Sequence, residues 1–250
     1  MMTSFLRCLA AAVLAALACA VPATAAPTPL FENTGDKCRN FGIFAPVDRA
    51  AARELLPARY QLPRPAFGLV ELASCEGGTL NGEPTGPYRI AEAAIVMPTL
   101  RGGIPFPLGD LNLWMLWLLD SDPELAAAKT AAGYAGGVVD IGFTPPQQGR
   151  TRRYAAQVDH DGGYALGGSM LFLSRGLGFP SINQQYADSP RGTIRTTNTI
   201  YRTTEALVGG ATATFAPGST LARLFGKTRV QGLGIAGTGW YRNATVLLGP

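Results

Sequence analysis

The chain has 250 residues, of which 47% are hydrophobic and only 15% charged, with a formal net charge of +4. This composition excludes a disordered protein, because disordered chains are polar and highly charged. The nearly balanced charge also argues against the basic stripe of a nucleic-acid-binding protein, so we expect no nucleic-acid partner. Glycine (31 residues) and proline (19 residues) are frequent, which favours many turns and short strands over a helix bundle.

The first 26 residues have the pattern of a secretory signal peptide. Arg7 precedes an apolar run rich in alanine and leucine, and Ala23-Thr24-Ala25 is a small-x-small cleavage site. The apolar run is shorter than the roughly 20 residues that a bilayer-spanning helix needs, so we expect no stable membrane span. The sequence thus predicts a signal peptide at 1–26, one domain at 27–250 and a secreted or periplasmic location. A loose lipobox pattern leaves open whether Cys19 is lipidated.

Two cysteines remain after the predicted cleavage, Cys38 and Cys75. An even pair of cysteines in a chain bound for an oxidising compartment is typical of a disulfide bond. A zinc site is disfavoured because no cluster of histidines accompanies the pair. We therefore predict that Cys38 and Cys75 form a disulfide.

The N-terminal part of the domain predicts one strand and one helix after an irregular arm. Residues 27–40 are polar and contain proline, which indicates a loosely held arm, and residues 41–45 predict a short strand. Asp48 is placed to cap a helix over residues 48–56, and Pro57 ends that helix.

The middle of the chain contains its most apolar run, LNLWMLWLL at 111–119. Its aromatic content and the glycine- and proline-rich lead-in favour a buried strand over a helix. A helix follows, because Ser121 and Glu124 fit a capping box and Gly133 is a helix stop.

Most of the remaining chain predicts strands separated by turns. The predicted strands are 67–73, 88–97, 138–143, 152–158, 163–174, 193–202, 206–215, 228–236 and 240–248. A short helix is expected at 219–225. Ten or so strands with two or three helices predict a single closed or strongly curled antiparallel sheet.

Three segments together resemble the acetoacetate decarboxylase family. They are FGIFAPVDRAAARELLPARYQL at 41–62, GPYRIAEAAIVM at 86–97 and LWLLDSDPELAAAKTAAGYAGG at 116–137. The resemblance covers about a quarter of the chain. It implies a mainly β (α+β) fold, a cone-shaped antiparallel β-barrel with two or three helices that encloses a small pocket.

The same resemblance implies that the family's Schiff-base lysine is missing. The family continues its third segment to a lysine that forms an imine with the substrate, and Gly136 occupies that position here. Lys129 lies on the predicted helix and does not replace it. The family's pocket glutamate matches Ile90, with Glu92 two residues further on.

These residues predict a barrel that binds a small, largely apolar ligand with a carbonyl or carboxylate group and does not decarboxylate it. We expect no catalytic residue, no cofactor and no metal, and we leave a homo-oligomer open. The alternative is an enzyme, a lyase or hydrolase, that uses a pocket carboxylate such as Glu92. A third hypothesis is a structural protein whose barrel is filled by side chains. The expected ligand-binding residues are Ile90, Glu92, Trp117, Tyr134 and Gly136.

The only histidine of the chain lies in Asp159-His160-Asp161-Gly162-Gly163. An acid–base cluster or metal site at this segment is one interpretation. Asp-Gly-Gly between two alternating runs is, however, typical of a β-hairpin turn. We interpret the segment as a turn.

Overall fold

The computed structural model describes residues 28–98, 111–144, 151–175 and 181–248. The predicted signal peptide, with Cys19, lies outside the described residues. The described part of the chain is mostly strand with three short helices, as predicted. None of the helices in these ranges is long and apolar enough to cross a membrane.

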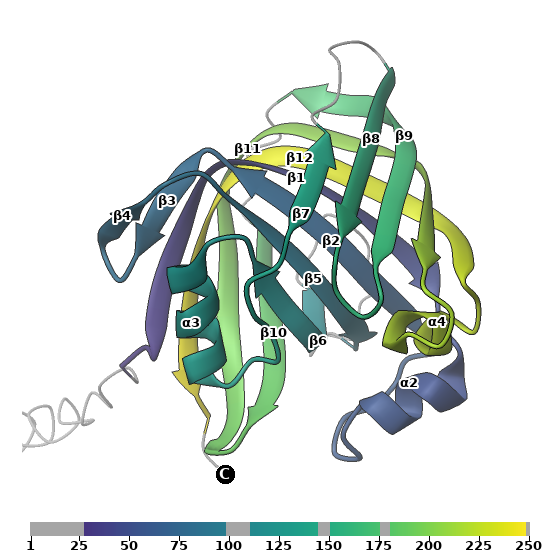
Figure 1. Cartoon of the computed structure of the whole chain (residues 1–250), viewed down its shortest axis with the longest axis horizontal. Helices are drawn as coiled ribbons and strands as arrows, with labels where there is room; N and C mark the ends of the chain where they lie inside the picture. The colour runs from purple at the N-terminus through teal and green to yellow at the C-terminus, as the bar shows by residue number, and fades with distance from the viewer. Residues whose placement is uncertain (1–27, 99–110, 145–150, 176–180, 249–250) are drawn as a thin grey trace, which may run out of the picture.

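The central feature is a ring of hydrogen-bonded strands (Figure 1). Around the ring each strand pairs with the next, and β12 pairs with β1 to close it. All pairs in the ring are antiparallel except the parallel pair β6–β10. In order, the strands of the ring are β1 (Phe31–Pro46), β2 (Phe67–Cys75), β5 (Tyr88–Met97), β6 (Leu111–Asp120), β10 (Ser181–Ser189), β11 (Gly192–Phe215) and β12 (Arg229–Leu247).

Two groups of strands extend from the ring. The small hairpin β3 (Gly77–Leu80) and β4 (Glu83–Thr85) pairs with the start of β1. The other group is β9 (Tyr164–Arg175), β8 (Thr151–Val158) and β7 (Ile141–Thr144), and it pairs with the second half of β11.

Each of the three described helices begins after a residue whose side chain caps its N-terminus. Helix α2 (Arg49–Leu55) is capped by Asp48, as predicted, and α4 (Thr220–Phe225) is capped by Ser219. Helix α3 (Pro123–Ala132) ends at Gly133 in the left-handed conformation. Its cap is Asp122 and not Ser121, because the Ser121 hydroxyl accepts a hydrogen bond from the Arg89 backbone N–H instead.

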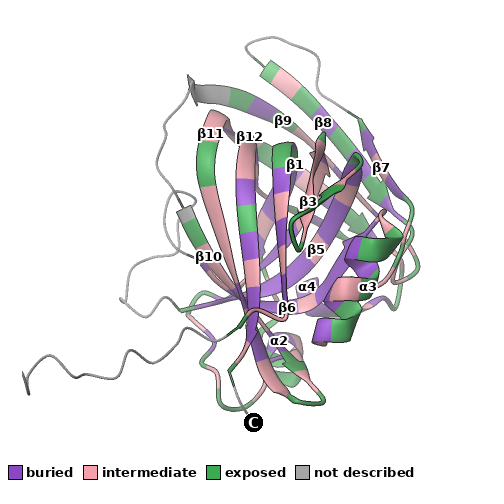
Figure 2. Cartoon of the chain, turned by 90° about the vertical axis from the view of Figure 1, so that its left-hand side faces the viewer, coloured by how far each residue is buried: buried purple, intermediate pink, exposed green. Residues whose placement is uncertain are grey.

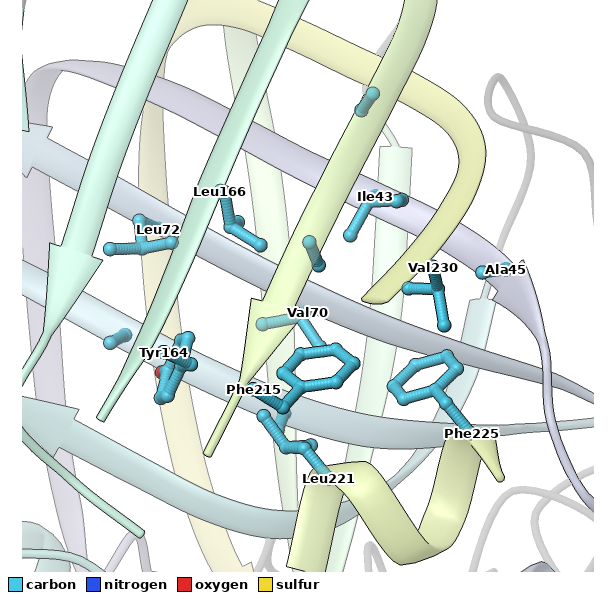
Figure 3. Close-up of a cluster of buried hydrophobic side chains, with 14 of the residues drawn as sticks. Ile43, Ala45, Val70, Leu72, Tyr164, Leu166, Phe215, Leu221, Phe225 and Val230 are labelled. Atoms are coloured by element: carbon cyan, nitrogen blue, oxygen red, sulfur yellow. The ribbon is translucent and has the colours of Figure 1, made fainter. Parts of the chain in front are cut away.

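Alternating side chains of β2 and β5 face two different environments. Val70 and Leu72 of β2 pack with Tyr164 and Leu166 of β9 in an apolar core on one face (Figure 3). The intervening residue Glu71 faces the opposite way, toward the interior of the ring. The strand period therefore places the apolar core on one face of β2 and Glu71 on the other, and Figure 2 shows which parts of the ring are buried.

The structure corrects two features of the sequence prediction. Residues 31–40 form the first part of β1 and not a loose arm, because they pair with β12 and β3. The strands predicted at 193–202 and 206–215 are one strand, β11, and the two predicted at 228–236 and 240–248 are one strand, β12.

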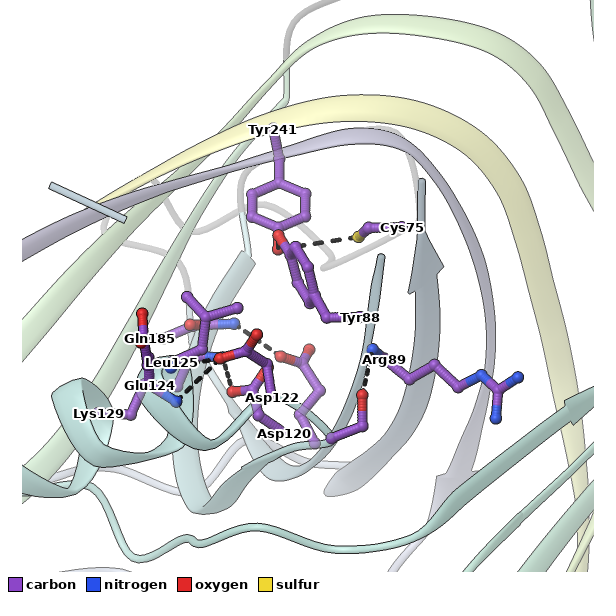
Figure 4. Close-up of polar contacts among 12 residues, drawn as sticks. Cys75, Tyr88, Arg89, Asp120, Asp122, Glu124, Leu125, Lys129, Gln185 and Tyr241 are labelled. Carbon is purple, nitrogen blue, oxygen red and sulfur yellow. Dashed lines mark hydrogen bonds and ion pairs between the residues drawn. The ribbon is translucent and has the colours of Figure 1, made fainter. Parts of the chain in front are cut away.

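The predicted disulfide is confirmed. Cys38 and Cys75 are bonded, and their Cα atoms are 3.9 Å apart on the neighbouring strands β1 and β2. Beside it the Tyr241 hydroxyl lies 3.9 Å from Cys75 Sγ and 2.5 Å from the Tyr88 hydroxyl (Figure 4). The bond therefore joins two ring strands next to a buried pair of tyrosines.

Candidate functional site

A cavity of about 340 Å³ lies inside the ring. Every ring strand contributes to its wall, and α3 adds one side chain, Lys129. Part of the wall is apolar, including Leu118, Leu207 and Ile235, and part is polar. The described residues thus leave a cavity inside the ring, which argues against the third hypothesis, a structural protein whose interior is filled by side chains.

Two glutamates face each other across neighbouring strands of this wall. Glu71 on β2 is the direct cross-strand partner of Glu92 on β5, and both are partly buried residues that border the cavity. Each carboxylate accepts one hydrogen bond from an amide. Asn40 Nδ2 donates to Glu71 at 2.8 Å, and Gln185 Nε2 donates to Glu92 at 2.9 Å.

This placement makes the pair hold a proton at neutral pH. Desolvation, together with the neighbouring charge of Glu71, raises the pKa of Glu92 to about 8, although Lys129 and Gln185 act in the opposite direction. Desolvation also raises the pKa of Glu71, against the hydrogen bond from Asn40. Because burial and the charge of Glu71 both disfavour ionisation of Glu92, Glu92 keeps its proton at neutral pH.

The third charged group is Lys129, which is 1% exposed. Its amine forms an ion pair with Asp120, which is fully buried at the end of β6 (Figure 4). Desolvation raises the pKa of Asp120 to about 6, although Lys129 lowers it. The sequence argument placed Lys129 on the helix and set it aside, but its side chain reaches the wall of the cavity.

The structure brings some of the predicted site residues together and separates others. Ile90 and Glu92 both line the cavity. Trp117 instead packs in the apolar core on the other face, with its ring 4.9 Å from that of His160 and 6.3 Å from that of Tyr164. Its place opposite Ala93, and not Glu92, accounts for this orientation.

Tyr134 and Gly136 are not among the residues that line the cavity. The Tyr134 hydroxyl is 2.6 Å from the Thr196 hydroxyl, and the side chain packs in a buried cluster with Leu118. Gly136 lies against the backbone of β6, and a Cβ atom added to Gly136 would lie only 2.3 Å from the Leu118 carbonyl oxygen. A lysine at 136 therefore has no room without a shift of the backbone. A ligand-binding role for any of the predicted residues stays a prediction.

Sequence reasoning missed Glu71, Lys129 and Gln185. A usable signal for Glu71 exists, since FGLVELASC and YRIAEAAIVM each carry one glutamate in the middle of an apolar strand. A charged residue at such a position is costly unless it has partners or a function.

The segment with the only histidine forms the turn of the β8–β9 hairpin, as predicted. Asp161, Gly162 and Gly163 have positive φ, which a tight turn requires. One Asp161 carboxylate oxygen accepts a hydrogen bond from the Leu221 backbone N–H at the start of α4. In the described ranges no group of three or more His, Cys, Asp or Glu side chains is arranged to hold a metal ion.

The raised pKa of Glu92 predicts a pH-dependent stability. A carboxyl whose pKa is higher in the folded state stabilises the fold fully below its unfolded pKa and loses this effect as pH rises to about 8. Because the group borders a cavity that water can enter, we expect a loss on the order of 2 kcal/mol between pH 5 and pH 8. Urea unfolding of wild type, Glu92→Gln and the exposed control Glu54→Gln measures this. A pH profile unchanged by Glu92→Gln contradicts it.

The fold is that of acetoacetate decarboxylase-like structures. One similar structure is an acetoacetate decarboxylase-like enzyme from Sphingomonas wittichii RW1, with 13% identity, a TM-score of 0.59 and coverage of 87% of this chain and 92% of that chain. A second is the enduracididine biosynthesis enzyme MppR complexed with pyruvate, with 12% identity, a TM-score of 0.56 and coverage of 90% and 91%. A third is acetoacetate decarboxylase from Legionella pneumophila, with 13% identity, a TM-score of 0.52 and coverage of 92% of both chains.

No family model and no curated protein matches the sequence. The mainly β fold of this type that the three sequence segments implied is confirmed by the structural likeness. At such low identity the likeness concerns the fold alone.

Proposed function

We propose that the protein is an enzyme that performs acid–base chemistry on a small carbonyl compound in the ring cavity. The observation that carries the proposal is the cross-strand pair Glu71–Glu92 on the cavity wall. Like the enzyme alternative of the sequence analysis, it uses the pocket carboxylate Glu92, but its chemistry is proton transfer and not that of the lyase or hydrolase named there; it departs from the main expectation of a binding protein.

Three further facts support the proposal. Burial raises the pKa of Glu92 to about 8, so this carboxyl is a proton donor at neutral pH, and the proposal assigns the role of proton acceptor to Glu71 beside it. Lys129 brings a positive charge to the same wall, which favours negative charge developing on a substrate oxygen. The similar structures include an enzyme complexed with pyruvate and an acetoacetate decarboxylase, both named for chemistry or ligands with a carbonyl group.

The proposed step is enolisation. Ionised Glu71 takes a proton from the carbon next to the carbonyl group, and the electrons of that C–H bond form a carbon–carbon double bond. The carbonyl oxygen takes a proton from neutral Glu92, which yields an enol. One proton enters the pair and one leaves it, so the oxidation state of the substrate does not change.

Proton exchange tests this function directly. Purified wild type is incubated with pyruvate in D₂O, and loss of the methyl proton signal is followed by NMR. The proposal expects exchange above the uncatalysed rate that stays with the protein through purification. Absence of exchange with pyruvate, and with acetoacetate as a second substrate, contradicts the proposal.

A second candidate function is favoured by the position of Lys129. A buried amine at the wall of a carbonyl-binding cavity is suited to imine formation, in which the neutral amine attacks the carbonyl carbon and water leaves. Asp120 is placed to accept the ammonium proton that must first be lost.

Borohydride separates the two candidates. Reduction in the presence of acetoacetate, followed by peptide mass mapping, labels Lys129 if an imine forms, and CO₂ release is then expected as well. Under the first candidate neither occurs, because no electron sink is formed. The absence of both labelling and CO₂ release would agree with the expectation, drawn from Gly136 at the lysine position, that acetoacetate is not decarboxylated.

We propose further that the protein is exported. The disulfide Cys38–Cys75 supports this, because such bonds persist in oxidising compartments. Intact mass of protein from its own host is expected to show a chain that starts at Ala26 or Pro27 and has no free thiol. A full-length chain, or a mature chain in which Cys38 and Cys75 are both titratable thiols, contradicts the proposal.

A further inference from the structure

Near Glu92, the cavity wall carries three amide side chains with unpartnered oxygens. Gln185 Oε1, Asn198 Oδ1 and Asn243 Oδ1 are buried and accept no hydrogen bond, and all three residues line the cavity. Gln185 is only 2% exposed and Asn243 only 6%. We call Gln185, Asn198 and Asn243 the amide wall.

The sheet register explains why these side chains lie together. Asn198 on β11 is the direct partner of Asn243 on β12, and it is also the partner of Asn183 on β10. Gln185 follows Asn183 by two residues, so it projects from the same face of β10. The strands β10, β11 and β12 are neighbours, and their amides therefore form one continuous patch on the inner face of the ring.

Unpartnered buried oxygens point to a ligand. A buried acceptor left without a donor is costly, and native proteins contain few such groups without a reason. Three of them on one cavity wall are satisfied together if a bound molecule brings hydrogen-bond donors.

The charge of the wall narrows the ligand class. Asparagine and glutamine are neutral, and the charged residues that line the cavity in the described ranges are Glu71, Glu92, Glu205 and Lys129. An anionic group bound at the amide wall would be repelled, because the described residues that line the cavity include three glutamates and only one lysine. It would also supply acceptors where donors are needed.

A hydroxyl group fits the amide wall best. It donates to an amide oxygen and accepts from an amide N–H, so it pairs with either orientation of an asparagine or glutamine side chain. We propose that the amide wall is a subsite for a hydroxylated, uncharged tail of the substrate, whose carbonyl end lies at Glu71 and Glu92. The inference rests on the proposed function only for the position of the carbonyl end.

The substrate class is therefore a hydroxylated keto compound. The amide wall holds its hydroxyl groups, and the apolar residues Leu207 and Ile235 leave room for its carbon chain. A keto compound of the same length without hydroxyls leaves the three amide oxygens unpaired and binds less tightly.

Calorimetric titration with two matched ligands tests the subsite without reference to turnover. One is a six-carbon 2-keto acid with hydroxyl groups on carbons 4 to 6, and the other is 2-oxohexanoate, which has the same length and no hydroxyl. We expect wild type to bind the hydroxylated acid at least about tenfold more tightly, since each unpaired buried acceptor has a substantial cost. Equal affinity, preference for 2-oxohexanoate or absence of binding of both at millimolar concentration overturns the proposal.

Variants of the amide wall test whether its residues cause the preference for the hydroxylated acid. Asn243→Leu and Asn198→Leu are each expected to reduce it severalfold while 2-oxohexanoate binds as before. Gln184→Leu is the matched control, because Gln184 also carries an amide on β10 but its oxygen is paired with Thr197 and it does not line the cavity. If Asn243→Leu does not fold, the less buried Asn198 and the two-ligand comparison in wild type still decide.

The outcome is separable from that of the enzyme proposal. Preference for the hydroxylated acid without proton exchange supports the subsite and removes the proposed chemistry. Exchange on pyruvate without any preference between the two six-carbon acids supports the chemistry and removes the subsite.

Discussion

Replacing Glu92 with glutamine should reduce the rate of proton exchange on a small keto acid by about 100-fold or more. Glutamine keeps the size of the side chain and can still bond to Gln185, but it has no carboxyl proton to give to the carbonyl oxygen. General acid–base groups contribute about 10²- to 10⁴-fold to a rate. The residue paired with Glu92 on the neighbouring strand is Glu71, which the proposal already uses as the base. NMR-monitored exchange in D₂O at neutral pH measures the effect.

Glu71→Gln should cause a loss of similar size, because it removes the base of the same pair. Glu54→Gln, an exposed change on α2, is the matched control and should leave the rate unchanged. Two glutamate variants that exchange protons at the wild-type rate would show that the cavity carboxyls have no part in the chemistry.

Replacing Lys129 with methionine should lower the free energy of unfolding by about 3–5 kcal/mol at neutral pH. Methionine fills a similar volume, but it leaves the carboxylate of fully buried Asp120 without its positive partner. Breaking a buried ion pair on one side is costly because an uncompensated charge remains in a medium of low dielectric. Urea denaturation followed by circular dichroism gives the difference.

The double variant Lys129→Met with Asp120→Asn should recover much of this loss, since no charge is then left buried. Lowering the pH toward 5 should also reduce the loss in the single variant, because Asp120 then takes up a proton. A loss below about 1 kcal/mol in the single variant would contradict the importance of the pair for folding.

Much of the fold could be predicted because the relevant signals are local. Asp48 and Ser219 cap helices, and Gly133 ends one, through bonds to residues a few positions away. The strand at 88–97 has the predicted bounds. The predicted break in β11 coincides with a bulge near Thr203 and Glu205, so the sequence marked an irregularity without showing that the strand continues.

Strand β10 was not predicted because the site itself determines its composition. The sequence SINQQYADS has few apolar residues and no clear alternation of apolar and polar side chains. Asn183 and Gln185 face inward although they are polar, because they form the polar part of the cavity wall. A pattern search for a buried apolar face therefore overlooks the strand that carries part of the site.

The candidate site could be predicted only in part, because its pairs depend on register. Ile90 and Glu92 were placed in the pocket through one strand of the family resemblance. That Glu71 lies opposite Glu92, and that Lys129 meets Asp120, depends on how separate strands and a helix align in space. No local spacing in the sequence encodes these contacts.

The closure of the ring has a consequence for the order of folding. Phe31 near the start of β1 lies opposite Thr245 near the end of β12, so the ring joins the two extremes of the described chain. Contacts so distant in sequence form late and slowly, since a long loop must first be closed. Until β12 is in place, β1 and β11 each present an unpaired edge of the kind that aggregates. Tyr241 and Asn243 belong to that last strand. We therefore expect the cavity to form last, and we expect that a chain truncated before β12 cannot close the ring.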